Sequence, residues 1–398
     1  RARGYAPLPL RPHGTVSDIL AVGAHLKNTI AVSVGGNVFL SQHIGDLETE
    51  PSTGAFRAAI DGFLRLYAMR PKWVAADMHP DYASSRYARA SGIPLIEIQH
   101  HHAHVAACMA ENELEGEVLG VCWDGTGYGE DGTVWGGEFL RTEGAGFARA
   151  ATFRRFRLPG SERAVREPRR AALGALYEIM GDAVFGETDL APVRAFDAAE
   201  MPVLGRMLAR GIQSPWTTSA GRLFDAVASL AGLRQKLRFE GQAAMELESA
   251  AGGGETGGSY PFELRLSERA QAGPLIVDWE PLLRAVIADV RAAVPPATIA
   301  ARFHDALANI IVAVAHKMEV PRIVLTGGCF QNSILLEGAV GRLNAEGFRP
   351  YWHQRVPPND GGIALGQIAA ASLVIAAGGG NDFTTRGGGH VPCGSGKD

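Results

Sequence analysis

The segment Cys122-Trp-Asp-Gly-Thr-Gly-Tyr-Gly-Glu-Asp-Gly-Thr-Val-Trp-Gly-Gly-Glu138 continues the apolar run Val118–Trp123. The run predicts a buried strand, and the glycines after it predict a turn that leads into a second strand. The backbone N–H groups of such a glycine turn can cradle a phosphate. A tight hairpin in which Asp124 only caps the turn explains the same residues, but we favour the phosphate site.

The histidine-rich segment Gln99-His-His-His-Ala-His-Val-Ala-Ala-Cys108 lies upstream, where a predicted strand passes into the predicted helix His101–Glu111. His100 and His104 are four residues apart, so on a helix their imidazoles share one face. That geometry is common for a divalent-metal pair, and two histidines need further oxygen ligands, which Asp124 could supply. The alternative is a polar helix start with incidental histidines. Four histidines within five residues favour a metal or catalytic site.

Two glycine pairs stand before predicted helices in the last part of the chain. The segment Val324–Asn332 predicts a strand that runs into Gly327 and Gly328 and then into a helix. Two glycines let the backbone approach a phosphate or adenine, and a helix N-terminus adds positive potential, although ordinary strand–helix packing is the alternative. In Pro357–Ile363, Asp360 is equally well explained as a helix N-cap and as an anionic ligand at a cleft.

Two acidic residues in the middle of the chain are candidate nucleotide ligands. Asp225 lies on the predicted helix Gly221–Gly232 and could hold a ribose hydroxyl. A solvated aspartate on a capped helix is the alternative. Glu240, which precedes Gly241, is similarly ambiguous.

Composition predicts a globular protein with a large buried core. The chain has 398 residues, of which 46% are hydrophobic and 20% charged. The formal net charge of −4 gives no reason to expect non-specific nucleic-acid binding. No uninterrupted apolar run reaches the roughly 18 residues of a membrane span. The four cysteines form no Cys-x-x-Cys pair, which excludes a cysteine-based zinc finger and favours a reducing, cytoplasmic location.

The order of predicted elements suggests two α/β lobes. Three strands and a helix follow one another near the start, and strands alternate with helices near the end. No sequence repeat is clear enough to establish a duplicated fold. We expect a linker or extended arm at 1–16, an N-terminal α/β lobe at 17–155, a largely helical insertion and connecting segment at 156–295, a C-terminal α/β lobe at 296–377 and a disordered tail at 378–398.

Several motifs in the same order resemble the C-terminal part of HypF, the carbamoyltransferase family that matures NiFe hydrogenases. More distantly, they resemble the tRNA threonylcarbamoyl transferases and the antibiotic O-carbamoyltransferases. The likeness covers most of the chain and rests on Arg3–Pro7, Leu40–Asp46, His79–Tyr82, Gln99–His104, Asp124–Glu138, Gly221–Ala226, Glu240–Ala244, Thr326–Asn332 and Pro357–Gly362.

The resemblance implies an α/β fold of the two-lobed actin-like ATPase (ASKHA) type, with a central nucleotide and metal cleft. It implies a divalent metal, zinc or iron, with Mg as a further possibility beside ATP. The matching metal-binding and catalytic positions are His100, His104, Asp124 and Asp360. The matching nucleotide positions are Gly125, Thr126, Gly127, Gly221, Asp225, Glu240, Gly327, Gly328 and Asn332.

The resemblance also implies a reaction and a partner. The expected reaction moves a carbamoyl group from carbamoyl adenylate, made from carbamoyl phosphate and ATP, to the C-terminal cysteine of HypE. We expect no nucleic-acid partner and no membrane. Full-length family members also carry an acylphosphatase domain, two cysteine-rich zinc fingers and an adenylating domain, none of which this sequence matches. A naturally short form and an excised piece both remain open.

Two other functions stay open at this point. One is a carbamoyl or threonylcarbamoyl transferase that acts on a small molecule or tRNA, although Gln99–His104 lacks the His-Xaa-Glu-Gly-His form of the tRNA enzymes. The other is a non-catalytic nucleotide-binding scaffold for hydrogenase maturation.

Overall fold

The computed structural model describes residues 8–252, 257–267 and 273–378. The expected disordered tail therefore lies outside the described residues, apart from Gly378. In the expected arm at the start, Leu10 exchanges two backbone hydrogen bonds with Val38 and is buried. This part of the arm is thus packed against the first sheet.

The first sheet has five strands in the order β3-β2-β1-β4-β5. The first three strands are antiparallel, and β4 and β5 run parallel to β1. The apolar run of β4 is buried, as expected for a parallel strand with both faces covered. The strands are β1 (Ile19–Ala21), β2 (Ala31–Val34), β3 (Asn37–Leu40), β4 (Trp73–Asp77) and β5 (Leu95–Ile98).

The second sheet repeats this order as β8-β7-β6-β13-β14, again with three antiparallel strands followed by two parallel ones. Four more strands extend it at the β8 edge and beside β7. The repeated order gives two lobes of the same topology and confirms the expected actin-like fold. The strands are β6 (Leu119–Tyr128), β7 (Val134–Glu143), β8 (Gly146–Phe153), β9 (Phe156–Arg157), β10 (Trp216–Thr217), β11 (Glu263–Arg265), β12 (Leu275–Asp278), β13 (Arg322–Thr326) and β14 (Arg349–Trp352).

The sheets divide the chain differently from the expected lobe boundary at residue 155. Strands β6, β7 and β8 lie within 17–155, yet β6 pairs with β13, which comes much later in the chain. The change of sheet thus falls near Val118. The segment 156–295, expected to be largely helical, also contributes β9 to β12 to the second sheet. Local hydrophobic patterns identify strands but do not identify a pairing partner so distant in sequence.

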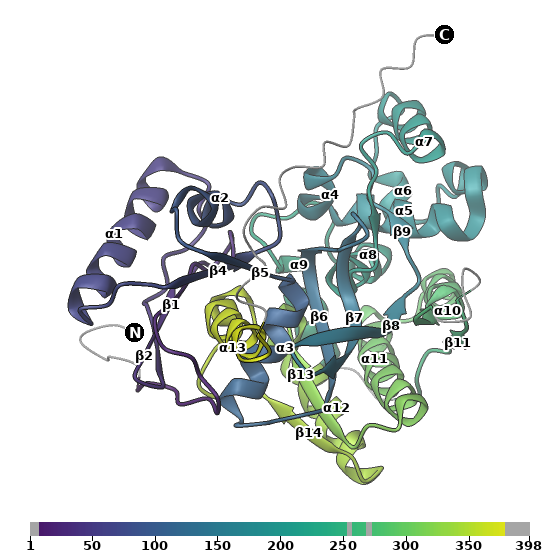
Figure 1. Cartoon of the computed structure of the whole chain (residues 1–398). Helices are drawn as coiled ribbons and strands as arrows, with labels where there is room; N and C mark the ends of the chain where they lie inside the picture. The colour runs from purple at the N-terminus through teal and green to yellow at the C-terminus, as the bar shows by residue number, and fades with distance from the viewer. Residues whose placement is uncertain (1–7, 253–256, 268–272, 379–398) are drawn as a thin grey trace.

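Two helices, α3 (His100–Glu111) and α13 (Ile363–Ala376), pack against each other between the two sheets (Figure 1). Helix α13 lies against the first sheet, and α3 lies against β6 and β13. A Cβ at Gly366 would overlap the carbonyl oxygen of Ala103, so the missing side chain permits this close approach. The pair carries residues from both expected lobes into the middle of the molecule.

Further helices cover the outer faces of both sheets. Helix α1 begins after the capping-box residue Thr49 and buries Phe56 and Ile60 in the first lobe. The remaining helices are α1 (Glu50–Leu66), α2 (Ala83–Ala90), α4 (Glu162–Arg166), α5 (Pro168–Met180), α6 (Ala191–Arg194), α7 (Glu200–Arg210), α8 (Ala220–Leu230), α9 (Gln242–Ala251), α10 (Glu280–Arg291), α11 (Pro296–Met318) and α12 (Ser333–Ala345), with 3₁₀ turns η1 (Gly181–Gly186), η2 (Gly328–Gln331) and η3 (Asp360–Gly362).

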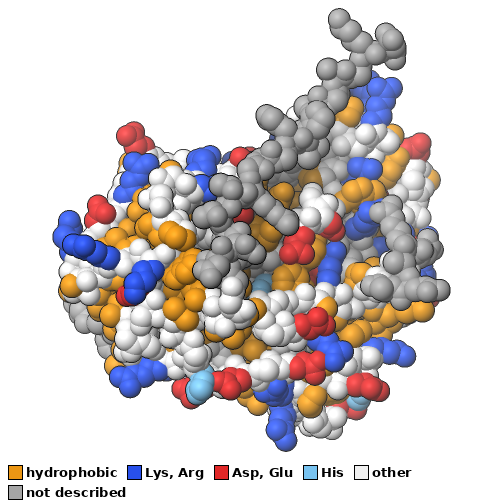
Figure 2. Space-filling model, in the orientation of Figure 1, with side chains coloured by type: hydrophobic (Ala, Val, Ile, Leu, Met, Phe, Trp, Pro, Cys, Tyr) orange, Lys and Arg blue, Asp and Glu red, His pale blue; other side chains and the backbone are white. Residues whose placement is uncertain are grey.

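Among the described residues, α11 alone is long and apolar enough to cross a membrane. Most of its apolar side chains, including Phe303, Ile310 and Ile311, are buried in the core of the second lobe. A core helix passes the same test of length and composition, so α11 is weak evidence for a membrane span. On the face shown in Figure 2, side chains of both charges are interspersed.

Candidate metal and nucleotide site

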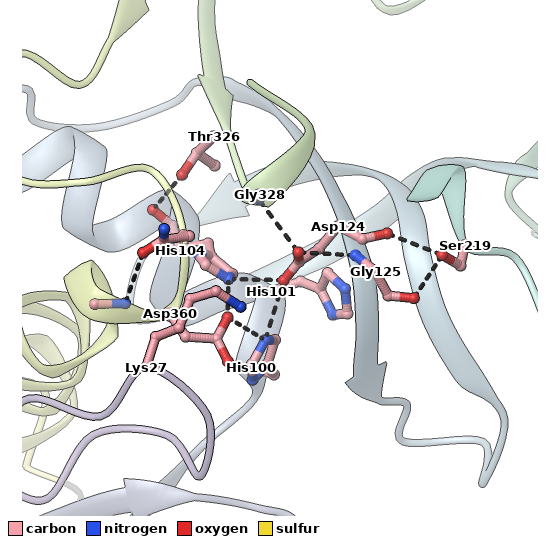
Figure 3. Close-up of polar contacts among 12 residues, drawn as sticks. Lys27, His100, His101, His104, Asp124, Gly125, Ser219, Thr326, Gly328 and Asp360 are labelled. Atoms are coloured by element: carbon pink, nitrogen blue, oxygen red, sulfur yellow. Dashed lines mark hydrogen bonds and ion pairs between the residues drawn. The ribbon is translucent and has the colours of Figure 1, made fainter. Parts of the chain in front are cut away.

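Four side chains meet where α3 lies between the lobes. Gln99 caps α3 by accepting a hydrogen bond from the backbone of His102, so the helix begins at His100 and places His100 and His104 one turn apart. Asp124 comes from β6 and Asp360 from η3 (Figure 3). One nitrogen or oxygen atom from each of the four residues lies within 4.8 Å of all the others: His100, His104, Asp124 and Asp360.

The atoms of this cluster suit a divalent metal ion. Asp124 Oδ2 lies 3.2 Å from His104 Nε2 and 3.5 Å from His100 Nε2. Asp360 Oδ1 lies 3.6 Å and 3.7 Å from the same two nitrogens. His100 Nε2 is buried and has no hydrogen-bond partner, as an atom reserved for a ligand would be. Two imidazole nitrogens and two carboxylate oxygens form a donor set that zinc and iron accept.

The buried histidines and aspartates of the cluster shift one another's pKa values. Burial would lower the pKa of His100, but Asp77, Asp124 and Asp360 outweigh it and hold the pKa well above its ordinary value. Burial would raise the pKa of Asp124, but His100 and His104 hold it well below its ordinary value. Asp124 is therefore ionised and offers an anionic ligand oxygen.

Asp77, at the end of β4, supports the cluster from behind. Its Oδ2 lies 2.7 Å from Nδ1 of His100, and both side chains are fully buried. A carboxylate on Nδ1 orients the ring so that Nε2 faces the other residues of the cluster. Asp77 is not among the site residues predicted from the sequence. The sequence feature that could have identified it is an aspartate at the end of a buried strand, just before the His79–Tyr82 motif.

The glycine segment after Asp124 is a bulge inside a strand, and the expected turn directly after Trp123 is wrong. Strand β6 continues to Tyr128, and its pairing with β7 shifts register between Trp123 and Gly127. The hairpin turn comes later, where Gly129 N–H donates to Thr133 O. A bulge re-aims the backbone without ending the strand, which places Asp124 in the cluster.

Backbone amides hold one oxygen of Asp124. Its Oδ1 accepts hydrogen bonds from the N–H of Gly125 at 2.8 Å and of Gly328 at 3.2 Å. The Ser219 hydroxyl lies 2.9 Å and 2.6 Å from the carbonyl oxygens of Asp124 and Gly125. These two glycine amides therefore position the aspartate, and Oδ2 is left to face the histidines (Figure 3).

A cavity opens beside the cluster, and we call it the nucleotide cavity. Both cluster aspartates line it, together with six of the nine expected nucleotide positions: Gly125, Thr126, Gly221, Asp225, Glu240 and Gly328. Gly221 packs against the backbone of Gly125, and a Cβ there would lie 2.8 Å from the Gly125 Cα. This glycine thus permits α8 to approach the bulge.

The other three expected nucleotide positions do not line the cavity, and each has a structural role. Gly127 lies under the rings of His100 and His101, where a Cβ would overlap them. Gly327 has a φ of +96° and contacts the backbone of β6. The Asn332 side chain caps α12. A glycine needed for packing has the same sequence signature as one needed for a ligand.

A buried ion pair forms part of the cavity wall. Asp225 Oδ2 lies 2.9 Å from Arg222 Nη1, without the alignment of a hydrogen bond. Burial raises the pKa of Asp225 to about 6, although Arg222 acts to lower it. Arg222 Nη1 also donates to Val165 O. Arg222 is not among the site residues predicted from the sequence, because its position in a helical motif gives no sign that it faces a cavity.

Lys27 is a second cation at the cavity that the sequence did not predict. It comes from the first lobe, and its Nζ lies 2.6 Å from Glu240 Oε2 across the mouth of the cavity. Burial acts to lower the pKa of Lys27, but Glu240, Asp360 and Asp124 raise it above its ordinary value. Lys27 therefore stays protonated and faces the cluster carboxylates (Figure 3).

The described cysteines have the features of packing residues. Cys108 and Cys122 are free and fully buried, and Cys329 borders the nucleotide cavity. Burial raises the pKa of all three thiols well above the ordinary value. They are therefore protonated at neutral pH and poor nucleophiles.

Comparison with known families covers both lobes. Residues 120–367 match the family model "Carbamoyltransferase, Kae1-like Domain, second subdomain". Residues 14–111 match the "HypF Kae1-like domain" model.

Curated relatives carry the same family name. The chain is 40% identical to carbamoyltransferase HypF of Synechocystis sp., over 93% of this chain and 49% of the relative. It is 34% identical to a carbamoyltransferase HypF homolog of Cupriavidus necator, over 89% of this chain and 92% of that relative. The chain spans about half the length of most curated relatives it matches.

Solved structures agree with these matches. A full-length HypF in the phosphate- and nucleotide-bound form superposes with a TM-score of 0.87 at 38% identity, over 94% of this chain and 58% of that chain. The HypF of T. kodakarensis superposes with a TM-score of 0.82 at 29% identity, over 95% of this chain and 50% of that chain. The chain therefore belongs to the HypF carbamoyltransferase family and corresponds to its Kae1-like domain.

Proposed function

We propose that the chain transfers a carbamoyl group from carbamoyl adenylate to the thiol of the C-terminal cysteine of HypE. The adenylate would be made from carbamoyl phosphate and ATP. The observation that carries the proposal is the buried cluster of His100, His104, Asp124 and Asp360, whose carboxylates line a cavity in a member of a carbamoyltransferase family.

The reaction needs an external nucleophile. The acceptor sulfur forms a bond to the carbamoyl carbon, and the bond from that carbon to the phosphate oxygen breaks. AMP leaves with the electron pair, and the thiol proton is released. The protonated, buried thiols of Cys108 and Cys122 accord with a nucleophile supplied by the partner. Free cysteines also accord with the cytoplasm as the place of the reaction.

The cavity residues have complementary roles in this proposal. Lys27 and Arg222 are cations at the wall and would bind the phosphate of the adenylate. Asp225 and Glu240 would accept hydrogen bonds from ribose hydroxyls. The bulge at Gly125 and Thr126 brings the backbone to the wall of the nucleotide cavity.

The cluster would hold a divalent metal ion, zinc or iron, with Mg as a companion of ATP. A metal at this place supplies a Lewis acid that polarises carbonyl or phosphoryl oxygens. His100 and His104 would hold it through their Nε2 atoms, and the amides of Gly125 and Gly328 fix the Asp124 carboxylate.

The direct test is mass spectrometry of HypE after incubation with this chain and preformed carbamoyl adenylate. We expect the mass to rise by one carbamoyl group in place of one hydrogen. The double variant His100→Ala/His104→Ala should lose bound metal and transfer together. The matched control is His316→Ala, an exposed histidine that pairs with Glu346 away from the cluster.

Each other outcome has a distinct meaning. Full transfer by the metal-free double variant would contradict the role of the metal. Binding of the adenylate and HypE without any thiocarboxamide would identify a scaffold. Transfer to a small molecule or tRNA in place of HypE would identify a different carbamoyltransferase. A parallel sample with ATP and carbamoyl phosphate tests whether the chain forms the adenylate itself.

A further inference from the structure

A second cavity lies beside the nucleotide cavity and shares the Gly125–Thr126 bulge with it. We call it the side chamber. Its walls come from the first lobe, through His25 and Tyr82, and from two segments of the second lobe, through Arg166 and Arg238. Both cavities are also lined by Leu26, Arg222 and Glu240. A group that enters the side chamber can therefore reach the space beside the cluster from a direction that the nucleotide need not occupy.

The two sides of the side chamber differ in charge: the first-lobe side is acidic, and on the second-lobe side arginines outnumber glutamates. Asp46 and Glu48 lie on the first-lobe side, and Asp46 already accepts a hydrogen bond from the Lys27 backbone at 2.8 Å. The second-lobe side carries three arginines and two glutamates: Arg166, Arg222, Arg238, Glu162 and Glu240. The arginine wall is the side that would attract an anionic group.

Arg166 and Arg238 are free to bind such a group. Within the described parts of the chain, neither guanidinium makes a hydrogen bond or an ion pair, whereas nearby Arg163 and Arg234 pair with glutamates. The two come from adjacent backbone segments, because Leu237 N–H donates to Arg166 O at 2.8 Å. Two exposed arginines on adjacent segments suit bidentate binding of one carboxylate.

Two aromatic rings, of His25 and Tyr82, form part of the lining of the side chamber. The rings of His25 and Tyr82 stack with centroids 5.2 Å apart. Burial raises the pKa of Tyr82 well above its ordinary value, and the charges of Asp77, Asp360 and Asp124 add to the effect. Tyr82 is thus within the electrostatic reach of the cluster and remains a hydrogen-bond donor.

We propose that the side chamber receives the acceptor as a peptide that ends in cysteine, and that Arg166 and Arg238 hold its terminal carboxylate. The inference rests on the proposed function, in which the acceptor atom is the thiol of a C-terminal cysteine. The last residue of a peptide carries its carboxylate and its side chain on the same Cα. Anchoring the carboxylate on the arginine wall therefore limits where the sulfur can lie. An internal cysteine lacks this carboxylate and is rejected.

The test compares two labelled peptides that end in cysteine, one with a free carboxylate and one with a C-terminal amide. Binding to the whole chain is measured by fluorescence anisotropy in the presence of a reductant. We expect the amide to bind at least about tenfold more weakly, as for the loss of a charge-assisted hydrogen bond. The double variant Arg166→Ala/Arg238→Ala should bind both peptides with the weaker affinity.

The control is Arg206→Ala on α7, an exposed arginine that lines neither cavity. It should preserve the preference for the free carboxylate. All three positions are exposed, so thermal melts should show that the variants fold. Equal binding of acid and amide by the unmodified chain would overturn the proposal. A preference that survives in the double variant would overturn the assignment to these arginines.

Failure of this inference can be told apart from failure of the proposed function. If the chain carbamoylates both peptides equally in the mass spectrometric assay, the transfer function stands and the carboxylate site does not. If the chain binds the free acid through the two arginines and forms no thiocarboxamide, the carboxylate site stands and the transfer function fails.

Discussion

Asp77 Oδ2 lies 2.7 Å from His100 Nδ1, and the side chains of both residues are inaccessible to solvent. The contact joins the last residue of β4 to the first residue of α3. It therefore determines which nitrogen of His100 faces the cluster, although Asp77 itself is not among the residues that meet there.

We expect Asp77→Asn to weaken metal binding by about ten- to a hundredfold, the usual effect of removing a carboxylate behind a metal-binding histidine. Asparagine retains Oδ1, which accepts a hydrogen bond from His79 N–H at 2.8 Å, so the turn after β4 should persist. Competition with a chromophoric zinc chelator measures the affinity. The matched control is Asp81→Asn in the following exposed loop. An unchanged zinc affinity in Asp77→Asn would show that Asp77 does not orient the histidine.

Glu111 stabilises the far end of α3. Its Oε1 accepts hydrogen bonds from the N–H groups of Gln354 at 2.9 Å and of Arg355, and its Oε2 lies 2.8 Å from His353 Nδ1. The other nitrogen of His353 lies 2.9 Å from the Thr326 hydroxyl, at the end of β13. Burial acts to raise the pKa of Glu111, but His353 and the backbone donors lower it below its ordinary value of 4.5.

We expect Glu111→Gln to lower the free energy of unfolding by about 1–3 kcal/mol near pH 7, because one amide group cannot accept all these hydrogen bonds. A carboxyl with a lowered folded-state pKa stabilises the protein above its unfolded-state pKa and loses that effect as the pH falls through the folded-state value. The difference in the free energy of unfolding between wild type and variant should therefore narrow below pH 4.5. Urea unfolding near pH 7 and again below pH 4.5 measures this difference. A difference that does not depend on pH would contradict the role of the ionised carboxylate.

Gly366 sets the contact between α13 and α3. A Cβ at this position would overlap the carbonyl oxygen of Ala103, so Gly366→Ala should separate the helices and destabilise the protein by about 1–3 kcal/mol. Because α3 carries His104, zinc affinity should fall as well. The control is Gly341→Ala on α12, where a Cβ meets nothing within 4 Å and stabilisation of about 0.4–1 kcal/mol is expected. Thermal unfolding of both variants separates the effect of the overlap from the general effect of alanine in a helix.

Some parts of the site could be predicted from the sequence and others could not. The four-residue spacing of His100 and His104 is a local property of a helix, so it could be recognised without a structure. Asp124 was a candidate for the further oxygen ligand that a histidine pair needs, whereas Asp360 was assigned to the same cluster by family resemblance, since no local pattern joins residues so distant in the chain. The repeated sheet order had no sequence signal because equivalent strands need only similar burial, and many sequences satisfy that need.

The missed residues depend on contacts between segments. Lys27 reaches Glu240 across the two lobes, and Arg222 faces the cavity only because α8 packs beside β6. The predicted nucleotide positions that do not line the cavity show the converse limit. Gly327 and Asn332 follow a strand and precede a helix as a phosphate-binding segment would, but they serve backbone packing and helix capping.

Asp225 should make stability depend on pH in the opposite sense to Glu111. Burial raises its folded-state pKa from 3.8 to about 6, so between these values the folded protein binds more protons than the unfolded chain. Stability should therefore fall as the pH rises through this window. The free energy of unfolding should differ by about 2 kcal/mol between the two ends of the window. One pKa unit corresponds to about 1.4 kcal/mol, and part of the effect falls outside the window because each end is the midpoint of one state's titration.

Asp225→Asn removes the titrating group, so the variant should gain stability relative to wild type as the pH rises from about 4.5 to about 7.5. Urea unfolding at the two pH values measures the change, and a constant difference would contradict the raised pKa. If Asp225 also accepts a hydrogen bond from a ribose hydroxyl, saturating AMP should stabilise the wild type more than the variant at the higher pH.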